Sequence, residues 1–308
     1  MLRAVNAPAK TMQGPMTARE WGGLLLLSVL WGGSFFFIEI GLRAFAPLTL
    51  VFARLALAAL ALHGLLLCLR IRLPGGRMWR WYLLLGLFNN ALPFALMFWS
   101  QTRIGGSLAS MLNATTPLFT VVLAHFFTRD EPMTPLRVLG CVLGAVGVGV
   151  MVGQEAFSGD GEVLAYAAVL GAGLCYAIAG IIGRRVRETP PLALATGQLT
   201  AAALVVLPAS LLIDKPWQSA APGLEPLLAL GALALISTSL AYVLYFRLLK
   251  TAGATNILLV TLLIPVSSAL LCVGLLDEVL TWQQAAGMAV IAAGLLLVDG
   301  RLLKRKRR

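Results

Sequence analysis

Long apolar blocks separated by short polar breaks run through almost the whole chain. Each block holds roughly 20 residues, the length that an α-helix needs to cross the hydrocarbon core of a bilayer. The blocks lack the alternation of apolar and polar residues that is typical of outer-membrane β-barrels. The pattern therefore predicts ten membrane-spanning helices, at residues 21–41, 47–69, 81–100, 104–127, 135–153, 161–183, 190–212, 224–247, 254–276 and 281–299.

The composition favours the same interpretation. Of 308 residues, 59% are hydrophobic and only 12% are charged, and the mean hydropathy is +0.88. Because an ordinary soluble domain carries about a quarter charged residues, the apolar excess must face lipid, which excludes a water-soluble enzyme. The segments between the blocks are too short to fold alone, so we expect one all-α integral membrane domain.

Basic residues gather on one side of the predicted helices. Twenty of the 24 Lys and Arg residues lie in residues 1–20, in every second loop and in residues 300–308, while the other loops hold three, Arg43, Arg103 and Lys215. Because basic loops stay in the cytoplasm, we expect a multi-pass protein of a bacterial inner membrane with both termini cytoplasmic. The net charge of +11 thus indicates orientation and not nucleic-acid binding. The basic tail is interpreted as a topological anchor, with docking on anionic lipids or trafficking as the alternatives.

The chain also repeats itself. Residues 98–152 resemble residues 246–298, and the matched pairs include Phe98 with Phe246, Gly105 with Gly253, Pro117 with Pro265, Glu131 with Glu278, Gly140 with Gly287 and Gly147 with Gly294. Upstream, Pro47 aligns with Pro191 and Arg54 with Gln198. The predicted halves, 21–153 and 161–299, hold five spans each. Since five is odd, the second half enters the membrane from the opposite side, and two such inverted repeats favour alternating access.

Several segments resemble a known transporter family. They are the opening WGGSFFFIEIGLRAFAPLTLVFARLALAALAL, the fourth and ninth spans that each run from Gly to Pro, and the acidic turns RDEPMT and LDEVLT. These are similar to EamA-type members of the drug/metabolite transporter superfamily. The length, the basic tail and the aromatic early spans are similar to amino-acid exporters of the YddG type. The resemblance implies ten spans, a central cavity lined mainly by spans one, three, four, six, eight and nine, and outward movement of small solutes such as amino acids.

Polar residues at mid-span are the main candidates for a solute site. Asn89 and Asn90 lie centrally in the third span, and their repeat partners are Ser237 and Thr238 in the eighth. Such groups at matched depth are suited to hold the amino and carboxylate groups of a zwitterion, or alternatively to bond neighbouring helices. Aromatic residues supply an apolar wall. The predicted cavity residues are Trp31, Ser34, Asn89, Asn90, Phe94, Asn113, Thr116, Tyr176, Ser237, Thr238, Tyr242 and Thr261.

Glycine and proline mark predicted gates. Asn113 and Thr116 precede Pro117, and Thr261 precedes Pro265, so both spans are expected to kink beside polar groups. Helix packing is the alternative role for these prolines. Gly105 and Gly253 are expected at tight turns.

The charged residues within spans bear on energy coupling. Glu39 precedes Arg43 by four residues, a spacing that predicts an ion pair, with a role in proton coupling as the alternative. Arg54 lies roughly 10 Å inside the second span, too deep to ignore yet within snorkelling range of the outer surface. It resembles an arginine common in this span of the family, and we interpret it as a structural charge, with a role in coupling as the alternative. No Asp or Glu lies at mid-span. This favours facilitative export over proton antiport.

Other function classes find little support in the chain. It holds no HExxH or GxSxG motif and no pair of aspartates within a span, so no enzyme is expected. The four cysteines lack metal-type spacing, and we expect no metal and no cofactor. The expected partners are a small-molecule substrate and the bilayer, while a monomer is one plausible state of assembly. A membrane sensor or assembly subunit remains an alternative, but it leaves the inverted repeat without a purpose.

Overall fold

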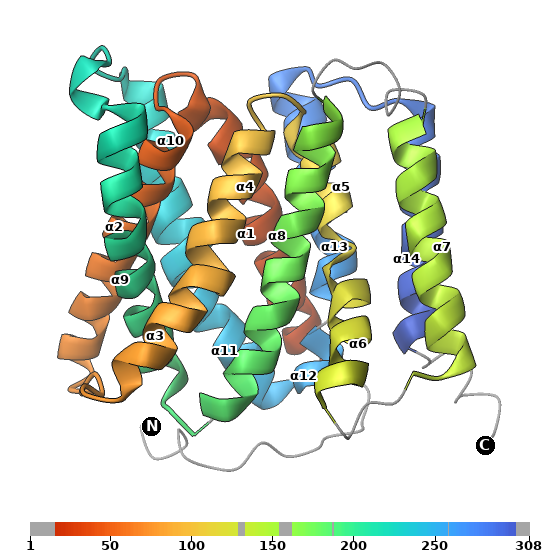
Figure 1. Ribbon diagram of the computed structural model, residues 1–308, viewed down its shortest axis with the longest axis horizontal. Coiled ribbons are helices and arrows are strands. Elements are labelled where there is room, and N and C mark those ends of the chain that lie inside the picture. The colour runs from red at the N-terminus through yellow and green to blue at the C-terminus, as the bar shows by residue number, and fades with distance from the viewer. Residues whose placement is uncertain (1–15, 129–132, 154–161, 187, 258, 300–308) are drawn as a thin grey trace.

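A computed structural model of the protein describes residues 16–128, 133–153, 162–186, 188–257 and 259–299 (Figure 1). Most of the N-terminal segment 1–20 and the whole tail 300–308, both expected in the cytoplasm, lie outside this description, as does Glu131. Every regular element of the described residues is a helix. The predicted all-α fold class is confirmed.

The first half of the chain forms five crossings. Its helices are α1 (Ala18–Leu42), α2 (Pro47–Cys68), α3 (Met78–Gly86), η2 (Leu87–Ala91), α4 (Leu92–Ser100), α5 (Gly106–Asn113), α6 (Thr116–Phe127) and α7 (Pro135–Val152). Here α3, η2 and α4 follow one another as one crossing, and α5 with α6 make another.

The second half repeats the arrangement. Its helices are α8 (Glu162–Gly183), η4 (Arg184–Val186), α9 (Pro191–Ala209), η5 (Ser210–Asp214), η6 (Pro216–Gln218), α10 (Leu224–Ala234), η7 (Leu235–Leu240), α11 (Ala241–Thr251), α12 (Ala254–Ile257), α13 (Val260–Leu276) and α14 (Trp282–Asp299). In the described residues, eight crossings are long and apolar enough to span a membrane, and the shorter apolar helices α13 and α14 bring the number to ten.

Helix starts follow local sequence signals. Thr17 caps α1 and forms a capping box with Glu20, which satisfies backbone N–H groups that a first helical turn leaves free. Proline occupies the first turn of α2, α7 and α9, where its missing N–H breaks no helical hydrogen bond.

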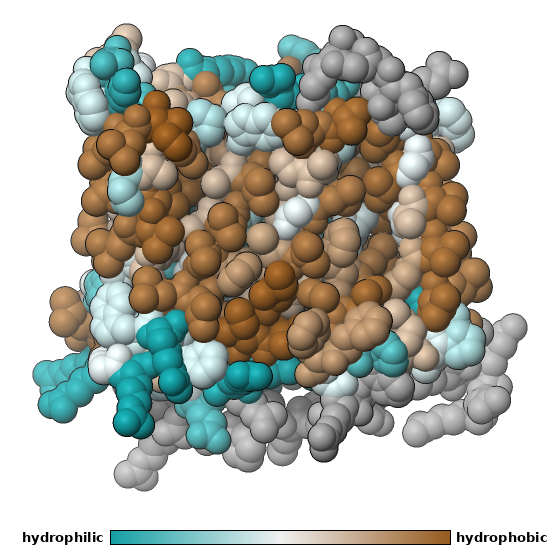
Figure 2. Space-filling model, in the orientation of Figure 1, coloured by the Kyte–Doolittle hydropathy of each residue, from teal (hydrophilic) through white to brown (hydrophobic). Residues whose placement is uncertain are grey.

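The outer surface suits a bilayer. A hydrophobic band crosses the face seen in Figure 2, and hydrophilic residues lie above and below it. Large side chains such as Leu60 and Leu270 are 67% and 71% exposed although they lie within membrane-crossing helices. Exposure of this kind is stable against lipid, so the chain is a multi-pass membrane protein.

Four glycines bring α7 and α14 into close contact. An ideal Cβ on Gly140 would lie 2.6 Å from the carbonyl oxygen of Gly294, and one on Gly147 would lie 2.8 Å from that of Gly287. Small residues allow such backbone approach between membrane helices. Because Gly140 corresponds to Gly287 and Gly147 to Gly294, exchanging the halves turns one contact into the other. The two helices therefore pack around the pseudo-two-fold axis of the repeat.

The axis also relates the remaining contacts. Helices α2 and α9 pack on each other, and α1 packs on α13 as α8 packs on α5 and α6. In Figure 1 the α2–α9 pair and the α7–α14 pair stand at opposite ends of the molecule. Between these two pairs lie α1, α8 and the crossings that consist of more than one helix, namely α3–η2–α4, α5–α6, α10–η7–α11 and α12–α13. These crossings carry most of the predicted polar residues.

The glycine crossing yields a stability prediction. Gly147→Ala is expected to destabilise the protein by about 1–3 kcal/mol, the usual range for an overpacked contact. Gly149→Ala is the matched control, because Gly149 lies on the same helix and a Cβ added there would have no atom within 4 Å. Thermal unfolding of both variants in detergent measures the difference. Equal melting temperatures would contradict the close contact of α7 with α14.

Candidate functional site

Both halves carry a π-helical turn at the same point of the repeat. The backbone N–H of Leu92 donates to the carbonyl oxygen of Leu87 in η2, and that of Ala241 donates to Ile236 in η7, each five residues back. A turn of this kind widens the helix and often occurs at functional sites. The two turns hold the four polar residues singled out by the repeat, Asn89, Asn90, Ser237 and Thr238.

Hydrogen bonds join the first turn to the second half. The Asn89 amide donates to the Gln198 Oε1 and to the Tyr242 hydroxyl, both at 3.4 Å. The Gln198 amide also donates to that hydroxyl at 3.4 Å, and the hydroxyl itself donates to the Asn90 Oδ1 at 3.2 Å. Tyr242 is thus the centre of a polar network that spans α9, α11 and η2.

Arg54 joins the second turn to the first half. Its Nε donates to the Thr238 hydroxyl at 2.9 Å, and its guanidinium lies over the Phe94 ring, 4.0 Å from the centroid. The residue is only 5% exposed. The sequence places Arg54 within snorkelling range of the surface and also suggests a structural polar position, and in the structure its side chain is buried against Thr238 and Phe94.

The surroundings of Arg54 and Gln198 are related by the repeat. Arg54 contacts Phe94 of its own half, and Gln198 contacts Tyr242, the repeat partner of Phe94. Stacked aromatic pairs lie behind both contacts, with Phe94 and Phe98 at 6.2 Å and Tyr242 and Phe246 at 5.9 Å between centroids. The two halves thus build one site from matched parts, but only one half supplies a charge.

Two polar atoms in the π-helical turns have no partner. The Asn90 amide nitrogen and the Ser237 hydroxyl are buried without a hydrogen bond among the described residues. An unsatisfied buried polar group costs free energy, so its presence at a symmetric, polar location is a sign of a ligand or water position.

Several other predicted cavity residues contact groups other than Asn89, Asn90, Gln198 and the Tyr242 hydroxyl. Trp31 packs against Tyr245 with centroids 5.5 Å apart, and the Tyr176 hydroxyl contacts the Met97 sulfur at 3.7 Å. Ser34 donates to the carbonyl oxygen of Trp31 in its own helix. In the fourth crossing, Thr116 donates to the carbonyl oxygen of Asn113 at 2.8 Å. Thr261 is half-buried in the first turn of α13.

The predicted hinges differ between the halves. Helix α5 ends at Asn113 and α6 begins at Thr116, so the fourth crossing is interrupted just before Pro117. In the ninth crossing α13 continues through Pro265, and the interruption lies earlier, between Ile257 and Val260. Gly253 has a φ of +83°, a conformation that favours glycine, whereas Gly105 at the start of α5 has an ordinary φ of −66°.

A second polar cluster lies at the end of the bundle that the charge pattern predicts to be extracytoplasmic. The Gly106 N–H donates to Glu39 at 3.2 Å, and the Ser107 N–H and hydroxyl donate to Glu278 at 3.1 and 2.7 Å. Two carboxylates thus cap the start of α5, where the helix dipole favours negative charge.

The ion pair expected from the spacing of Glu39 and Arg43 does not form. Arg43 instead pairs with Glu225 at 3.2 Å. The spacing rule fails here because both partners lie at the end of α1, where α5 and α10 from elsewhere in the chain offer competing groups.

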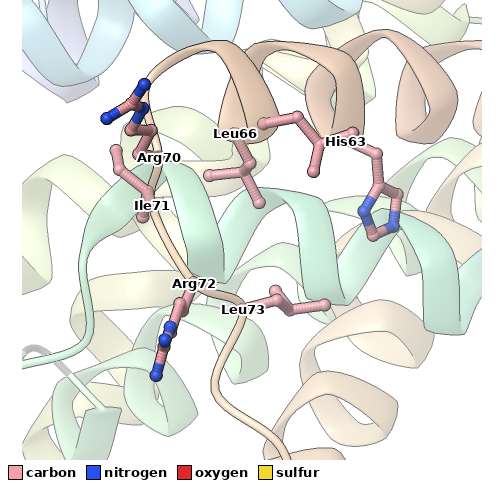
Figure 3. Close-up of a pocket in the computed structure, with 7 residues that line it drawn as sticks. His63, Leu66, Arg70, Ile71, Arg72 and Leu73 are labelled. Atoms are coloured by element: carbon pink, nitrogen blue, oxygen red, sulfur yellow. The ribbon is translucent and has the colours of Figure 1, made fainter.

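Two crevices lie away from the central network. One of about 570 Å³ follows the end of α2, and Figure 3 shows its His63 at one end and its Arg70 and Arg72 at the other. A second of about 520 Å³ is apolar and is lined by residues of α5, α13 and α14, among them Met111 and Pro265. Neither crevice contains the residues of the two π-helical turns.

Sequence reasoning left three site residues out of its candidates. Gln198 was named only as the repeat partner of Arg54, while Glu278 was noted in an acidic turn and Ser107 was not noted. The repeat held the signal for Gln198, since a polar residue aligned with a buried arginine lies in an equivalent environment. No sequence signal points to Ser107, because its partner Glu278 lies 171 residues away in the chain.

Comparisons with known proteins agree with this architecture. The sequence matches the EamA-like transporter family over residues 21–153 and 163–299. A solved crystal structure superposes with a TM-score of 0.68 at 19% sequence identity, covering 94% of this chain and 99% of that one, which shows a shared fold.

Curated relatives are similar over nearly the whole chain. The uncharacterized inner membrane transporter YedA of Escherichia coli is 27% identical over 286 residues, with 90% of each chain covered. Protein PecM of Dickeya dadantii is 26% identical over 91% of this chain and 92% of its own. A Salmonella typhimurium protein named "Probable amino-acid metabolite efflux pump" is 28% identical over 89% of this chain and 92% of its own.

The network around Tyr242 yields a second prediction. Tyr242→Phe removes a hydroxyl that three side chains contact, and each hydrogen bond between membrane helices contributes about 0.6 kcal/mol. We expect a loss of about 1–2 kcal/mol in stability. Tyr245→Phe, whose hydroxyl has no hydrogen bond among the described residues, is the control. Chemical unfolding in mixed micelles measures both, and equal stabilities would argue against the network.

Proposed function

Because this chain belongs to the EamA-like transporter family, we propose that it exports small metabolites, in particular amino acids including aromatic ones, by alternating access. It is a carrier and not an enzyme in this proposal. The expected orientation, with both termini in the cytoplasm, follows from the distribution of basic residues.

One observation carries the proposal. Polar clusters lie in π-helical turns at equivalent positions of the two halves, and each is hydrogen-bonded to the other half, η2 to Gln198 and Tyr242 and η7 to Arg54. A site at the interface of inverted repeats is reached from either side when the halves exchange their conformations.

The lining favours solutes with an apolar body and polar ends. Phe94, Phe98, Tyr242 and Phe246 give an aromatic wall beside the hydrogen-bonding groups. Aromatic rings pack well against such walls, and the polar groups are suited to an amino acid backbone. The name of the Salmonella relative points in the same direction.

Three polar contacts join the two halves at the expected outer side. Arg43 pairs with Glu225, the Thr49 N–H donates to Asp214 at 2.6 Å, and Ser107 donates to Glu278. Each contact joins an element of the first half to one of the second. In alternating access these contacts break when the central site opens outward.

A second candidate function is proton-coupled antiport. It is favoured by the oxygens of Glu39 and Glu278, which lie with the Cys272 sulfur within 4.8 Å of one another. Carboxylates on a transport route are the groups that proton-driven carriers use. Facilitative export stays the first candidate, because this pair lies at the end of the bundle and not at the central site.

Flux measurements test both candidates. Purified protein in proteoliposomes is expected to move labelled phenylalanine and other amino acids saturably without a pH gradient, relative to empty liposomes. Flux only with an imposed gradient would support proton-coupled antiport. If neither condition gave flux of amino acids, other metabolites or drugs, a sensor or assembly role would replace transport.

The central site yields a transport prediction. Asn90→Leu and Thr238→Leu each remove a polar group of a π-helical turn, and we expect each to lower flux about tenfold or more, the effect of roughly 1.4 kcal/mol. Leu60→Ala, at a lipid-exposed position, is the control. Wild-type flux in both leucine variants would remove these turns from the solute path.

The outer carboxylates yield a prediction that separates the two candidates. Glu278→Gln keeps the shape of the side chain and removes its charge. In a proton-coupled carrier it is expected to abolish the response of flux to a pH gradient, whereas a facilitative carrier keeps its gradient-independent flux. Glu225→Gln, which removes the exposed partner of Arg43, is the control for loss of a carboxylate on the same side.

A further inference from the structure

We propose that Arg54 is the recognition site for a carboxylate, so that the solutes of this protein must carry one. This inference rests on the proposed function, because it assigns a substrate class to the same central site. It goes further in requiring an anionic group and in excluding amines that lack one.

Arg54 forms no salt bridge with any residue that the structure describes. Within the ranges that the structure describes, the one salt bridge joins Arg43 to Glu225 at the end of the bundle. The Arg54 side chain contacts a neutral hydroxyl, that of Thr238, and aromatic rings, those of Phe94 and Phe98. A buried, unpaired cation inside a membrane is expensive, and where one persists it usually marks a ligand or ion path.

The geometry of Arg54 leaves its carboxylate-binding edge unused. The Thr238 hydroxyl accepts a hydrogen bond from the Nε, and the Phe94 ring covers one face of the guanidinium. The two terminal amino groups have no hydrogen-bond partner among the described residues. Two parallel N–H groups of a guanidinium fit the two oxygens of a carboxylate, and a side chain held by Thr238 and Phe94 loses little freedom on binding.

Other free polar groups complete the site. The Asn90 amide nitrogen, a donor, and the Ser237 hydroxyl are buried without partners. Asn90 is linked through Tyr242 to the network, and Ser237 adjoins Thr238, the residue bonded to Arg54. With a cation and a free amide donor here, and no acidic side chain bonded to them in the part of the chain that the structure describes, the site offers more to an anion than to a cation.

The second half provides a natural control for this assignment. Gln198 occupies the position equivalent to Arg54 and contacts Tyr242 as Arg54 contacts Phe94. The fold therefore accepts a glutamine in this environment. Arg54→Gln removes the charge while keeping a polar side chain that already packs in the matching place, and Arg54→Lys retains the charge without the planar fork.

The test compares solutes that differ by one group. Proteoliposomes are assayed with phenylalanine, 3-phenylpropionate, which lacks the amine, and phenethylamine, which lacks the carboxylate. Binding is measured separately as the shift in melting temperature of the protein in detergent. Wild-type protein is expected to bind the two carboxylates, to move phenylalanine, and to handle phenethylamine at least tenfold less well.

Variants assign that selectivity to Arg54. Arg54→Gln is expected to lower phenylalanine flux and binding at least tenfold and to remove the preference over phenethylamine, with Arg54→Lys between it and wild type. Arg103→Gln, which removes an exposed arginine at the end of its span, should change neither. A purely structural role for Arg54 would lower all fluxes together and leave the ratio between solutes unchanged.

The outcomes separate the inference from the proposed function. If wild-type protein moves phenethylamine as well as phenylalanine, or if Arg54→Gln keeps the preference, the carboxylate assignment is overturned and export stands. Carboxylate binding that depends on Arg54 without flux would keep the site and overturn export. An absence of both binding and flux in the wild-type protein would overturn both. If Arg54→Gln fails to fold, the wild-type solute ratios and Arg54→Lys still decide the assignment.

Discussion

Hydrocarbon offers no hydrogen bonds, and this constraint shapes the whole molecule. Every backbone N–H and C=O within the membrane must find its partner inside the protein, which leaves helices as the solution for an apolar chain of this kind. Side chains obey the same rule. Lipid-facing positions carry residues such as Leu60 and Leu270, while Arg54, Gln198 and the two Asn residues turn inward. Polar side chains thus gather in the centre because the lipid outside cannot form hydrogen bonds with them.

Inverted duplication gives this centre its form. A π-helical turn lies at the same point of the third and the eighth crossing, and each turn is hydrogen-bonded to the other half of the chain. Glycines on α7 and α14 allow the helices at that axis to pack closely. The scaffold is symmetric but its charge is not, because Arg54 of the first half corresponds to Gln198 of the second.

The ends of the bundle differ from its middle. At the expected outer side, carboxylates of Glu39 and Glu278 cap a helix start, and Arg43 pairs with Glu225. These contacts are close to water, where each is weak alone and readily broken. Weak polar contacts are appropriate where a carrier must open, whereas the apolar contact of α7 with α14 is suited to stay intact. The fold thereby combines a tightly packed helix pair, α7 with α14, with weak polar contacts at the expected outer side.

The sequence by itself determined the ten helices, the inverted repeat and the mid-span polar pairs, because hydrophobic length and residue spacing are local properties of the chain. It did not determine partners. The repeat matched Arg54 with Gln198, yet only the tertiary structure turned Arg54 inward to Thr238 and Phe94, and only it replaced the expected Glu39–Arg43 pair with contacts to Gly106 and Glu225. Such contacts join residues far apart in sequence, and which of several competing groups a side chain meets depends on how the helices pack. The interruption of the ninth crossing ahead of Pro265 was hidden for the same reason, since neighbouring helices decide where a backbone bends.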